Sequence, residues 1–320
     1  MSRATGDVPF YFVDVFAVRP LTGNPVAVVP DADHLTEAQM QGIAREFNQS
    51  ETTFVLPPGL PGATVRLRSF TPIGAEVFGA GHNALGAWLW LALADRLPAG
   101  AMMLADEPGG REHAGPGPAG QDPVSLAQHI GGDVLPVRVQ REAGGAVVVS
   151  MDQSPPQFGS IVGDRGALAA ALGLSADDLV PDDPAQVVAT GAGHLLVSLR
   201  DRAAVDRAAP HAAPLAAVLA SVGGEGCYLY SRERPEGDEA AAYARFFNPV
   251  MGIAEDPATG TAAGPLAALL VRQGHVEAGP AVIEQGHALG RPSRIHVRAS
   301  GPAVTVSGSG LISAEGVLHL

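Results

Sequence analysis

The sequence predicts a mixed fold of two similar halves, each with β-strands wrapped around one buried helix. Two segments carry this prediction, His82 to Leu97 and Gly260 to Val271, because each is apolar on nearly every side. A helix that is apolar all round must be buried all round. Both segments follow a glycine-containing turn with polar residues, at 79–83 and 255–261, so the same arrangement occurs in each half.

The remaining elements follow from local patterns. An amphipathic helix begins after Thr36, because Thr36 and Gln39 have the spacing of a capping box, and it ends near Asn48. Runs of β-prone residues predict strands at 10–18, 25–29, 52–56, 64–70, 134–139, 146–151, 195–199, 226–231, 241–247, 281–284, 293–297, 303–306 and 316–319. Further helices fit 167–172 and 214–222 on the outside of the second half.

The predicted domains are residues 1–153, which a C-terminal strand from about 307 to 320 can complete, and residues 154–306. The hinge between them is placed near Ser154-Pro155-Pro156, a turn-forming run. Residues 107–122 are rich in glycine and proline and cannot bury a core, so we expect a mobile loop there.

Composition excludes several classes of function. With 20 basic and 33 acidic residues, the net charge of −13 argues against nucleic acid and against anionic membranes as partners. The chain has no lysine, so a Schiff-base mechanism and a P-loop are both impossible. The polar N-terminus lacks an apolar signal core, and no apolar stretch reaches the roughly 20 residues of a membrane span, which predicts a cytoplasmic protein.

The starts of the two buried helices are the first candidate site. The first N–H groups of a helix have no intrahelical partner, so they attract carboxylates and phosphates. If both helices point their N-termini into one cleft between the halves, they form a dry, electropositive pocket. The residues at these two starts are His82, Asn83, Asp256, Thr259, Gly260 and Thr261. The alternative is that Asp256 and Thr259 merely cap a helix and that His82 is an ordinary buried histidine.

Glu51 is the candidate proton carrier. It lies just before the apolar strand at 53–56, where burial would raise its pKa and let it move protons near neutral pH. The alternative is a solvated loop glutamate. No metal is expected, because the 10 histidines form no His-Glu-x-x-His pattern and Cys227, the single cysteine, reads as a buried strand residue.

Several segments, in this order, resemble the PhzF-like isomerases of phenazine biosynthesis. They are Thr22-Gly23-Asn24-Pro25, Asn48-Gln49-Ser50-Glu51-Thr52-Thr53-Phe54, Arg68-Ser69-Phe70-Thr71-Pro72, Gly81-His82, Glu255-Asp256-Pro257-Ala258-Thr259-Gly260-Thr261-Ala262-Ala263-Gly264, Glu284-Gln285-Gly286 and Gly290-Arg291-Pro292-Ser293. The resemblance covers nearly the whole chain. It implies an α+β fold like that of diaminopimelate epimerase, with a mostly antiparallel sheet or barrel around a central helix in each half.

The resemblance also implies a cofactor-free isomerase, usually a homodimer, with Glu51 as general acid/base and with His82 and Asp256 holding the substrate. Gly260 and Thr261 fall at the second helix start, where the family more often has serine at position 261, and Gly81 and Asn83 complete the site we expect. The substrate we expect is a small carboxylate-bearing metabolite. Related epimerases use two thiols, which a chain with one cysteine cannot supply. Two other functions stay open: a carboxylate-binding module without turnover, and a racemase of an amino or hydroxy acid.

Overall fold

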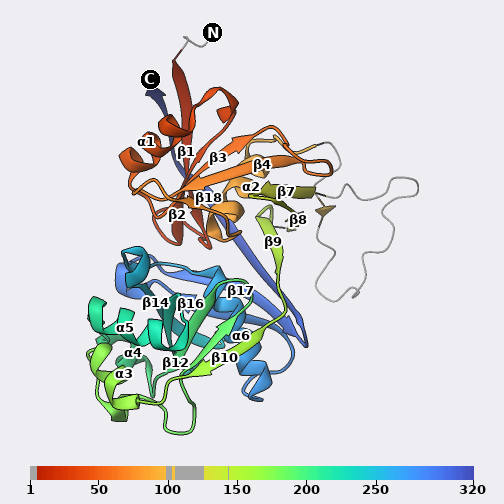
Figure 1. Cartoon of the computed structure of the whole chain (residues 1–320). Helices are drawn as coiled ribbons and strands as arrows, with labels where there is room; N and C mark the ends of the chain where they lie inside the picture. Colours follow the sequence, from red (N-terminus) through yellow and green to blue (C-terminus); the bar gives the residue numbers. More distant parts are fainter. Residues whose placement is uncertain (1–5, 99–102, 105–125, 143) are drawn as a thin grey trace. The chain divides into compact units, whose positions relative to one another are not determined.

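The chain divides into two compact units, Met1–Met151 with Ser307–Leu320, and Asp152–Val306 (Figure 1). The computed structural model describes residues 6–98, 103–104, 126–142 and 144–320. The stretch expected to be a mobile loop, 107–122, lies outside these residues. The α+β fold with a barrel around a central helix, predicted above, is confirmed.

In the first unit, eight strands of the described residues pair into a closed barrel around one helix. In cyclic order they are β1 (Asp7–Val15), β2 (Asn24–Val29), β3 (Thr52–Leu56), β4 (Val65–Phe70), β7 (Leu126–Ile130), β8 (Asp133–Arg141), β9 (Val147–Gln153) and β18 (Ala303–His319). Inside lies α2 (His82–Leu93), against β1 to β4 (Figure 1). Every residue of α2 from His82 to Ala92 is buried, as the all-apolar pattern predicts.

Outside this barrel lies α1 (Glu37–Phe47), and it confirms the predicted amphipathic helix. Thr36 is its N-cap, with a complete capping box to Gln39, and Asn48 ends it in the left-handed conformation. Its apolar stripe packs in a core cluster with Phe54 of β3 and Phe70 of β4. The short elements of this unit are η1 (Ala32–His34), β5 (Glu76–Val77) and β6 (Met103–Leu104).

The second unit repeats the pairing order of the first. Its strands are β10 (Gln157–Ile161), β11 (Gln186–Ala189), β12 (Gly193–Ser198), β13 (Gly226–Ser231), β14 (Ala242–Asn248), β15 (Ile253–Asp256), β16 (Gly279–Gln285) and β17 (Ser293–Ser300). Along β11-β12-β13-β14-β16-β17 the pairings alternate antiparallel and parallel, as they do along β1-β2-β3-β4-β7-β8. The central helix α6 (Gly260–Arg272) follows β15 as α2 follows β5.

Strand alternation gives the second unit two distinct faces. One face packs on the outer helices α3 (Arg165–Ala171), α4 (Arg202–Arg207) and α5 (Ala212–Val222), in a cluster that includes Cys227 and Leu229 of β13. Neighbouring side chains such as Tyr228 point to the other face, where α6 lies. The 3-10 turns are η2 (Ala176–Asp178), η3 (Pro249–Met251) and η4 (His287–Leu289).

The C-terminal strands differ from the prediction. The segments 303–306 and 316–319 are the two ends of one 17-residue strand, β18. Serines and glycines between them look like turn residues in the sequence. Here glycine serves close packing instead, because a Cβ on Gly310 would lie 2.4 Å from the carbonyl oxygen of Asp14, and one on Gly308 would lie 2.6 Å from the ring of Phe16.

Candidate active site

A carboxylate and an imidazole meet at the start of α2. Glu51 directly precedes β3, and alternation along that strand points it to the same side as Thr53, whose hydroxyl donates to the backbone oxygen of Asn83 in α2. Oε2 of Glu51 lies 3.0 Å from Nε2 of His82, the first residue of α2, and both side chains are at least 85% buried, with 15% and 10% exposed. Ser50 Oγ lies 3.2 Å from the same ring nitrogen.

The expectation that burial raises the pKa of Glu51 is wrong, because the groups around this carboxylate lower it. Burial does favour the neutral acid, but the charge of a protonated His82 and close polar contacts with His82 and Ser50 outweigh it. Together they hold the pKa of Glu51 below its ordinary value of 4.5. Glu51 is therefore ionised at neutral pH, which is the form that can accept a proton.

The start of α2 has no side-chain cap, in contrast to the capped start of α1. Gly81 is the N-cap residue, and it has no side chain that could accept from the first N–H groups. The side chain of Asn83 is used within the turn: Oδ1 accepts from the N–H of Gly81 at 2.8 Å, and Nδ2 donates to Gly79 and Ser69 at 3.1 Å. Asn83 therefore fixes the turn that presents Gly81 and His82.

The start of α6 is shaped by a buried hydrogen-bond network. Thr259 donates its hydroxyl to Oδ2 of Asp256 at 2.5 Å. Gln285 of β16, which is fully buried, donates to the backbone oxygen of Asp256 at 2.7 Å and accepts from the N–H of Thr259 at 3.1 Å. Tyr228 donates to the same Gln285 oxygen at 2.8 Å. These bonds fix the turn between β15 and α6.

Thr259 is the N-cap residue of α6, but its hydroxyl donates to Asp256 and makes no capping hydrogen bond with the first N–H groups of the helix. The amides of Gly260 and Thr261 are the first two of the helix, before the i→i−4 bonding pattern begins. Oγ1 of Thr261 lies 3.3 Å from Nε2 of His194. The hydroxyl and these N–H groups thus gather at one helix end.

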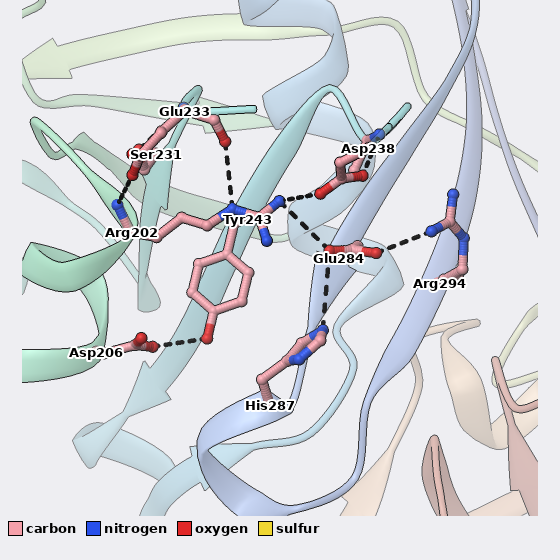
Figure 2. A network of polar contacts seen from close by, with 10 residues as sticks. Arg202, Asp206, Ser231, Glu233, Asp238, Tyr243, Glu284, His287 and Arg294 are labelled. Carbon is pink, nitrogen blue, oxygen red and sulfur yellow. Dashed lines mark hydrogen bonds and ion pairs between the residues drawn. The ribbon is translucent and has the colours of Figure 1, made fainter. Parts of the chain in front are cut away.

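Charged residues hold the strands on either side of this turn. Arg245 of β14 makes a two-point ion pair with Glu255 of β15, at 2.9 and 2.7 Å. Glu255 therefore links these two strands, whereas its neighbour Asp256 bonds within the turn that leads to α6. Figure 2 shows a second network around Glu284, which lies 2.8 Å from Arg294, 3.5 Å from Arg202 and 3.8 Å from His287. Because adjacent strand residues point to opposite sides, Glu284 anchors β16 from outside while Gln285 faces α6.

Each unit assembles its own share of the predicted residues. The first brings together Glu51, Gly81, His82 and Asn83, and the second brings together Asp256, Gly260 and Thr261. The expectation that both sets share one cleft stays a prediction. Sequence reasoning missed Gln285 and His194. The first lies in a segment that carries the family resemblance, whereas the second lies just before the strand predicted at 195–199, where no local pattern links it to Thr261.

Other features of the described residues involve none of the predicted site residues. A hollow of about 350 Å³ in the first unit is lined by Arg66, Arg68, Glu76, Phe78, Ile130, Gly131, Gly132 and Asp133. The described part of the chain holds no group of three or more His, Cys, Asp or Glu side chains suited to a metal ion. None of its helices is both long and apolar enough to cross a membrane. Cys227 is fully buried, and burial raises the pKa of its thiol far above the ordinary value.

Comparison with known proteins gives one consistent family. The family model described as phenazine biosynthesis-like protein, PhzC-PhzF, matches residues 13–316. A trans-2,3-dihydro-3-hydroxyanthranilate isomerase of Pseudomonas aeruginosa is 35% identical, over 97% of this chain and 99% of that protein. An uncharacterized isomerase of Salmonella typhimurium is 34% identical, over 94% of this chain and 95% of its own length.

Solved structures agree with this result. A PhzF-family protein of Bacillus anthracis superimposes with a TM-score of 0.83 at 25% identity, covering 98% of this chain and 99% of that one. A hydroxyproline epimerase of Agrobacterium vitis, at 12% identity, shares the fold with a TM-score of 0.59, over 100% of this chain and 94% of that one. The chain belongs to the PhzC-PhzF family of phenazine biosynthesis-like proteins and is an isomerase.

Proposed function

We propose that this isomerase moves a proton on a small carboxylate-bearing metabolite, with Glu51 as the general acid/base and without a cofactor. The observation that supports it is the buried contact of 3.0 Å between Glu51 and His82 at the uncapped start of a buried helix. A carboxylate that is ionised, shielded from bulk water and next to helix N–H donors has what proton abstraction from carbon requires.

In the proposed reaction, the ionised Glu51 takes a proton from a carbon atom and returns it to another carbon on the same face of the substrate. His82 orients the carboxylate of Glu51 and donates a hydrogen bond to the substrate atom on which negative charge develops. The first N–H groups of α2 point along the helix axis and stabilise the same charge. General acid/base catalysis contributes about 10²- to 10⁴-fold, and fixed donors in a water-poor site supply more.

The proposal assigns substrate binding to Gly81, His82 and Asn83 in the first unit. In the second unit it assigns the same role to Asp256, Gly260 and Thr261. Helix N-termini suit a carboxylate, because their N–H groups and partial positive charge favour an anion. Carboxylate oxygens are hydrogen-bond acceptors, as Oδ2 of Asp256 is toward the Thr259 hydroxyl, so the contact proposed for Asp256 is with an N–H or O–H group of the substrate.

The relatives suggest the first compound to assay. Three of them are named trans-2,3-dihydro-3-hydroxyanthranilate isomerases, at 34 to 35% identity. This compound carries a carboxylate on a small ring and fits the predicted class. A racemase that works with two thiols does not fit, because the sequence has one cysteine and it is buried on the face opposite α6.

The test compares Glu51→Gln with Glu225→Gln in an isomerisation assay on this dihydroanthranilate. Glu225 is the matched control, because it directly precedes β13 as Glu51 precedes β3, yet it is exposed. We expect kcat/KM to fall by about 10²- to 10⁴-fold in Glu51→Gln and to stay unchanged in Glu225→Gln. Binding of the unreactive aromatic analogue 3-hydroxyanthranilate should persist in both.

Other outcomes would overturn the proposal in distinct ways. Full activity of Glu51→Gln removes Glu51 from the mechanism. Tight binding of carboxylates with no turnover and no exchange of carbon-bound hydrogen identifies a binding module. Loss of optical rotation of an amino or hydroxy acid, with no shift of a double bond, identifies a racemase.

A further inference from the structure

His194 lies beside the start of α6 without a role in the proposed chemistry. It is the second residue of β12 and is 3% exposed. Its Nε2 lies 3.3 Å from Oγ1 of Thr261, and its ring meets the ring of Phe246 edge-on at 5.0 Å. Gly226 makes this packing possible, because a Cβ there would lie 2.5 Å from the ring of Phe246. The imidazole is therefore held firmly against Thr261.

The surroundings of the ring select one protonation state. Burial lowers the pKa of His194 to about 4, so the ring is neutral at physiological pH and carries one N–H. Nδ1 is buried and has no hydrogen-bond partner among the described residues. Nδ1 lacks a partner in either tautomer, but buried N–H groups without an acceptor are rarer in proteins than unpaired acceptors, which favours the proton on Nε2, where the Thr261 oxygen accepts it.

The hydroxyl of Thr261 is then directed. A hydroxyl has one proton and two lone pairs, and in this tautomer one lone pair of Oγ1 accepts from His194, whose Nε2 lies 3.3 Å away. Its own proton must find another acceptor. Thr259, two residues earlier, differs, because its hydroxyl proton is already used by Asp256. Of these two hydroxyls at the helix start, Thr261 is the one whose proton is left for a ligand.

We propose that His194 is a positioning residue that makes Thr261 a hydrogen-bond donor to the carboxylate of the substrate. The inference rests on the proposed function in one respect, which is that an anion binds at the start of α6. The amides of Gly260 and Thr261 and the Thr261 hydroxyl would then donate to that anion together. His194 does not touch the substrate. It acts through the hydroxyl that it orients.

The first test is the tautomer of His194, which can be read without any ligand. Protein labelled with ¹⁵N-histidine is observed by NMR between pH 5.5 and 8, and the His194 signals are identified by their absence from His194→Gln. We expect a neutral ring with the proton on Nε2 throughout. A proton on Nδ1, or a doubly protonated ring at pH 7, overturns the inference, whether or not the chain is an isomerase.

The second test measures binding of 3-hydroxyanthranilate. His194→Phe keeps an aromatic ring but removes the donor, and we expect about 2- to 10-fold weaker binding, the range of one ordinary hydrogen bond. His194→Gln, whose amide N–H can replace Nε2–H, should restore most of the affinity. His275→Gln is the matched control, because His275 also follows a glycine but is exposed, and it should change nothing.

Two further measurements distinguish the proposed positioning role of His194 from a role in packing alone. Thr261→Val should weaken binding alone and add little in the His194→Phe background, since the two residues then act as one unit. In turnover, His194→Phe should raise KM and leave kcat within about twofold, because the carboxylate contact is the same in ground and transition states. Additive losses, or unchanged affinity in His194→Phe, would contradict the inference. If the wild type neither binds nor isomerises these carboxylates, the proposed function fails instead, and the NMR result still decides the tautomer.

Discussion

Each unit has a glutamate directly before the third strand of the shared pairing order, β3 in the first unit and β13 in the second. The two glutamate side chains lie on opposite faces of their sheets. Glu51 precedes β3 and turns toward the central helix, where it meets His82 at 3.0 Å. Glu225 precedes β13, is exposed, and accepts from the N–H of Gly193 at 2.9 Å. Alternation groups Glu225 with Cys227 and Leu229, which pack on the outer helices.

The difference teaches how one strand order can serve two purposes. A shift of one residue in a strand start moves a side chain to the other face of the sheet. The first unit uses that freedom to aim an ionisable pair at the start of α2. The second unit surrounds the start of α6 with a closed network of Asp256, Thr259 and Gln285, and with a neutral histidine. In the proposed function, the first unit therefore carries the proton transfer together with part of the binding, whereas the second unit contributes binding alone.

After substitution of Glu51 itself, His82→Gln should cause the largest loss of kcat/KM. The substitution removes the positive charge while Glu51 stays buried, so the pKa of Glu51 should rise above 4.5 instead of lying below it. We expect kcat/KM to fall about 10- to 100-fold, the effect of losing a hydrogen bond to a charged group.

The pH dependence of kcat/KM checks the direction. In the wild type the midpoint of the loss caused by protonation of Glu51 should lie below pH 4.5, because the folded-state pKa is lowered. In His82→Gln the same loss should begin at a higher pH. An acid limb at the same pH in both proteins would show that His82 does not set the charge of Glu51.

A smaller effect, on stability, tests how the two central helices are packed. Each has a glycine at its fifth position, Gly86 and Gly264. A Cβ on Gly86 would lie 2.1 Å from Val26, a stiff side chain, so Gly86→Ala should lower the free energy of unfolding by about 1–3 kcal/mol. A Cβ on Gly264 would lie 1.8 Å from Oε1 of Gln153, a flexible side chain that can move, so Gly264→Ala should be less destabilising.

Chemical denaturation checks both values. Gly42→Ala in α1 is the control, because a Cβ there meets nothing within 4 Å, and it should stabilise the protein by about 0.4–1 kcal/mol. Equal gains in stability for Gly42→Ala and Gly86→Ala would mean that helix propensity, rather than contact with β2, decides the outcome.

The smallest effect is expected at Cys227. Its thiol is fully buried on the outer-helix face, and burial raises its pKa, so the reactive thiolate does not form. Cys227→Ala should keep the wild-type kcat/KM. A thiol reagent such as DTNB should label the unfolded protein but not the folded one. Loss of activity on labelling of the folded protein would place a thiol in the mechanism after all.

The sequence predicts features that depend on neighbouring residues, but it does not predict contacts between residues far apart in the chain. The two central helices and the capping box of α1 follow from local patterns, and both are confirmed. The lowered pKa of Glu51 could not be predicted, because it depends on His82, 31 positions later in the chain. His194 was missed for the same reason, since its partner Thr261 lies on a different element. Strand β18 was divided in the prediction because close packing and turns both favour glycine.

Exchange of hydrogen with solvent tests the central claim most directly. The wild type and Glu51→Gln are each incubated with trans-2,3-dihydro-3-hydroxyanthranilate in D₂O, and deuterium on the carbon atoms is followed by NMR. The carboxyl O–H of protonated Glu51 can exchange with D₂O before the proton returns to carbon, so the account predicts deuterium in the product of the wild type. It predicts none with Glu51→Gln, although that variant still binds 3-hydroxyanthranilate. Deuterium incorporated at the wild-type rate by Glu51→Gln would contradict the claim that this carboxylate carries the proton.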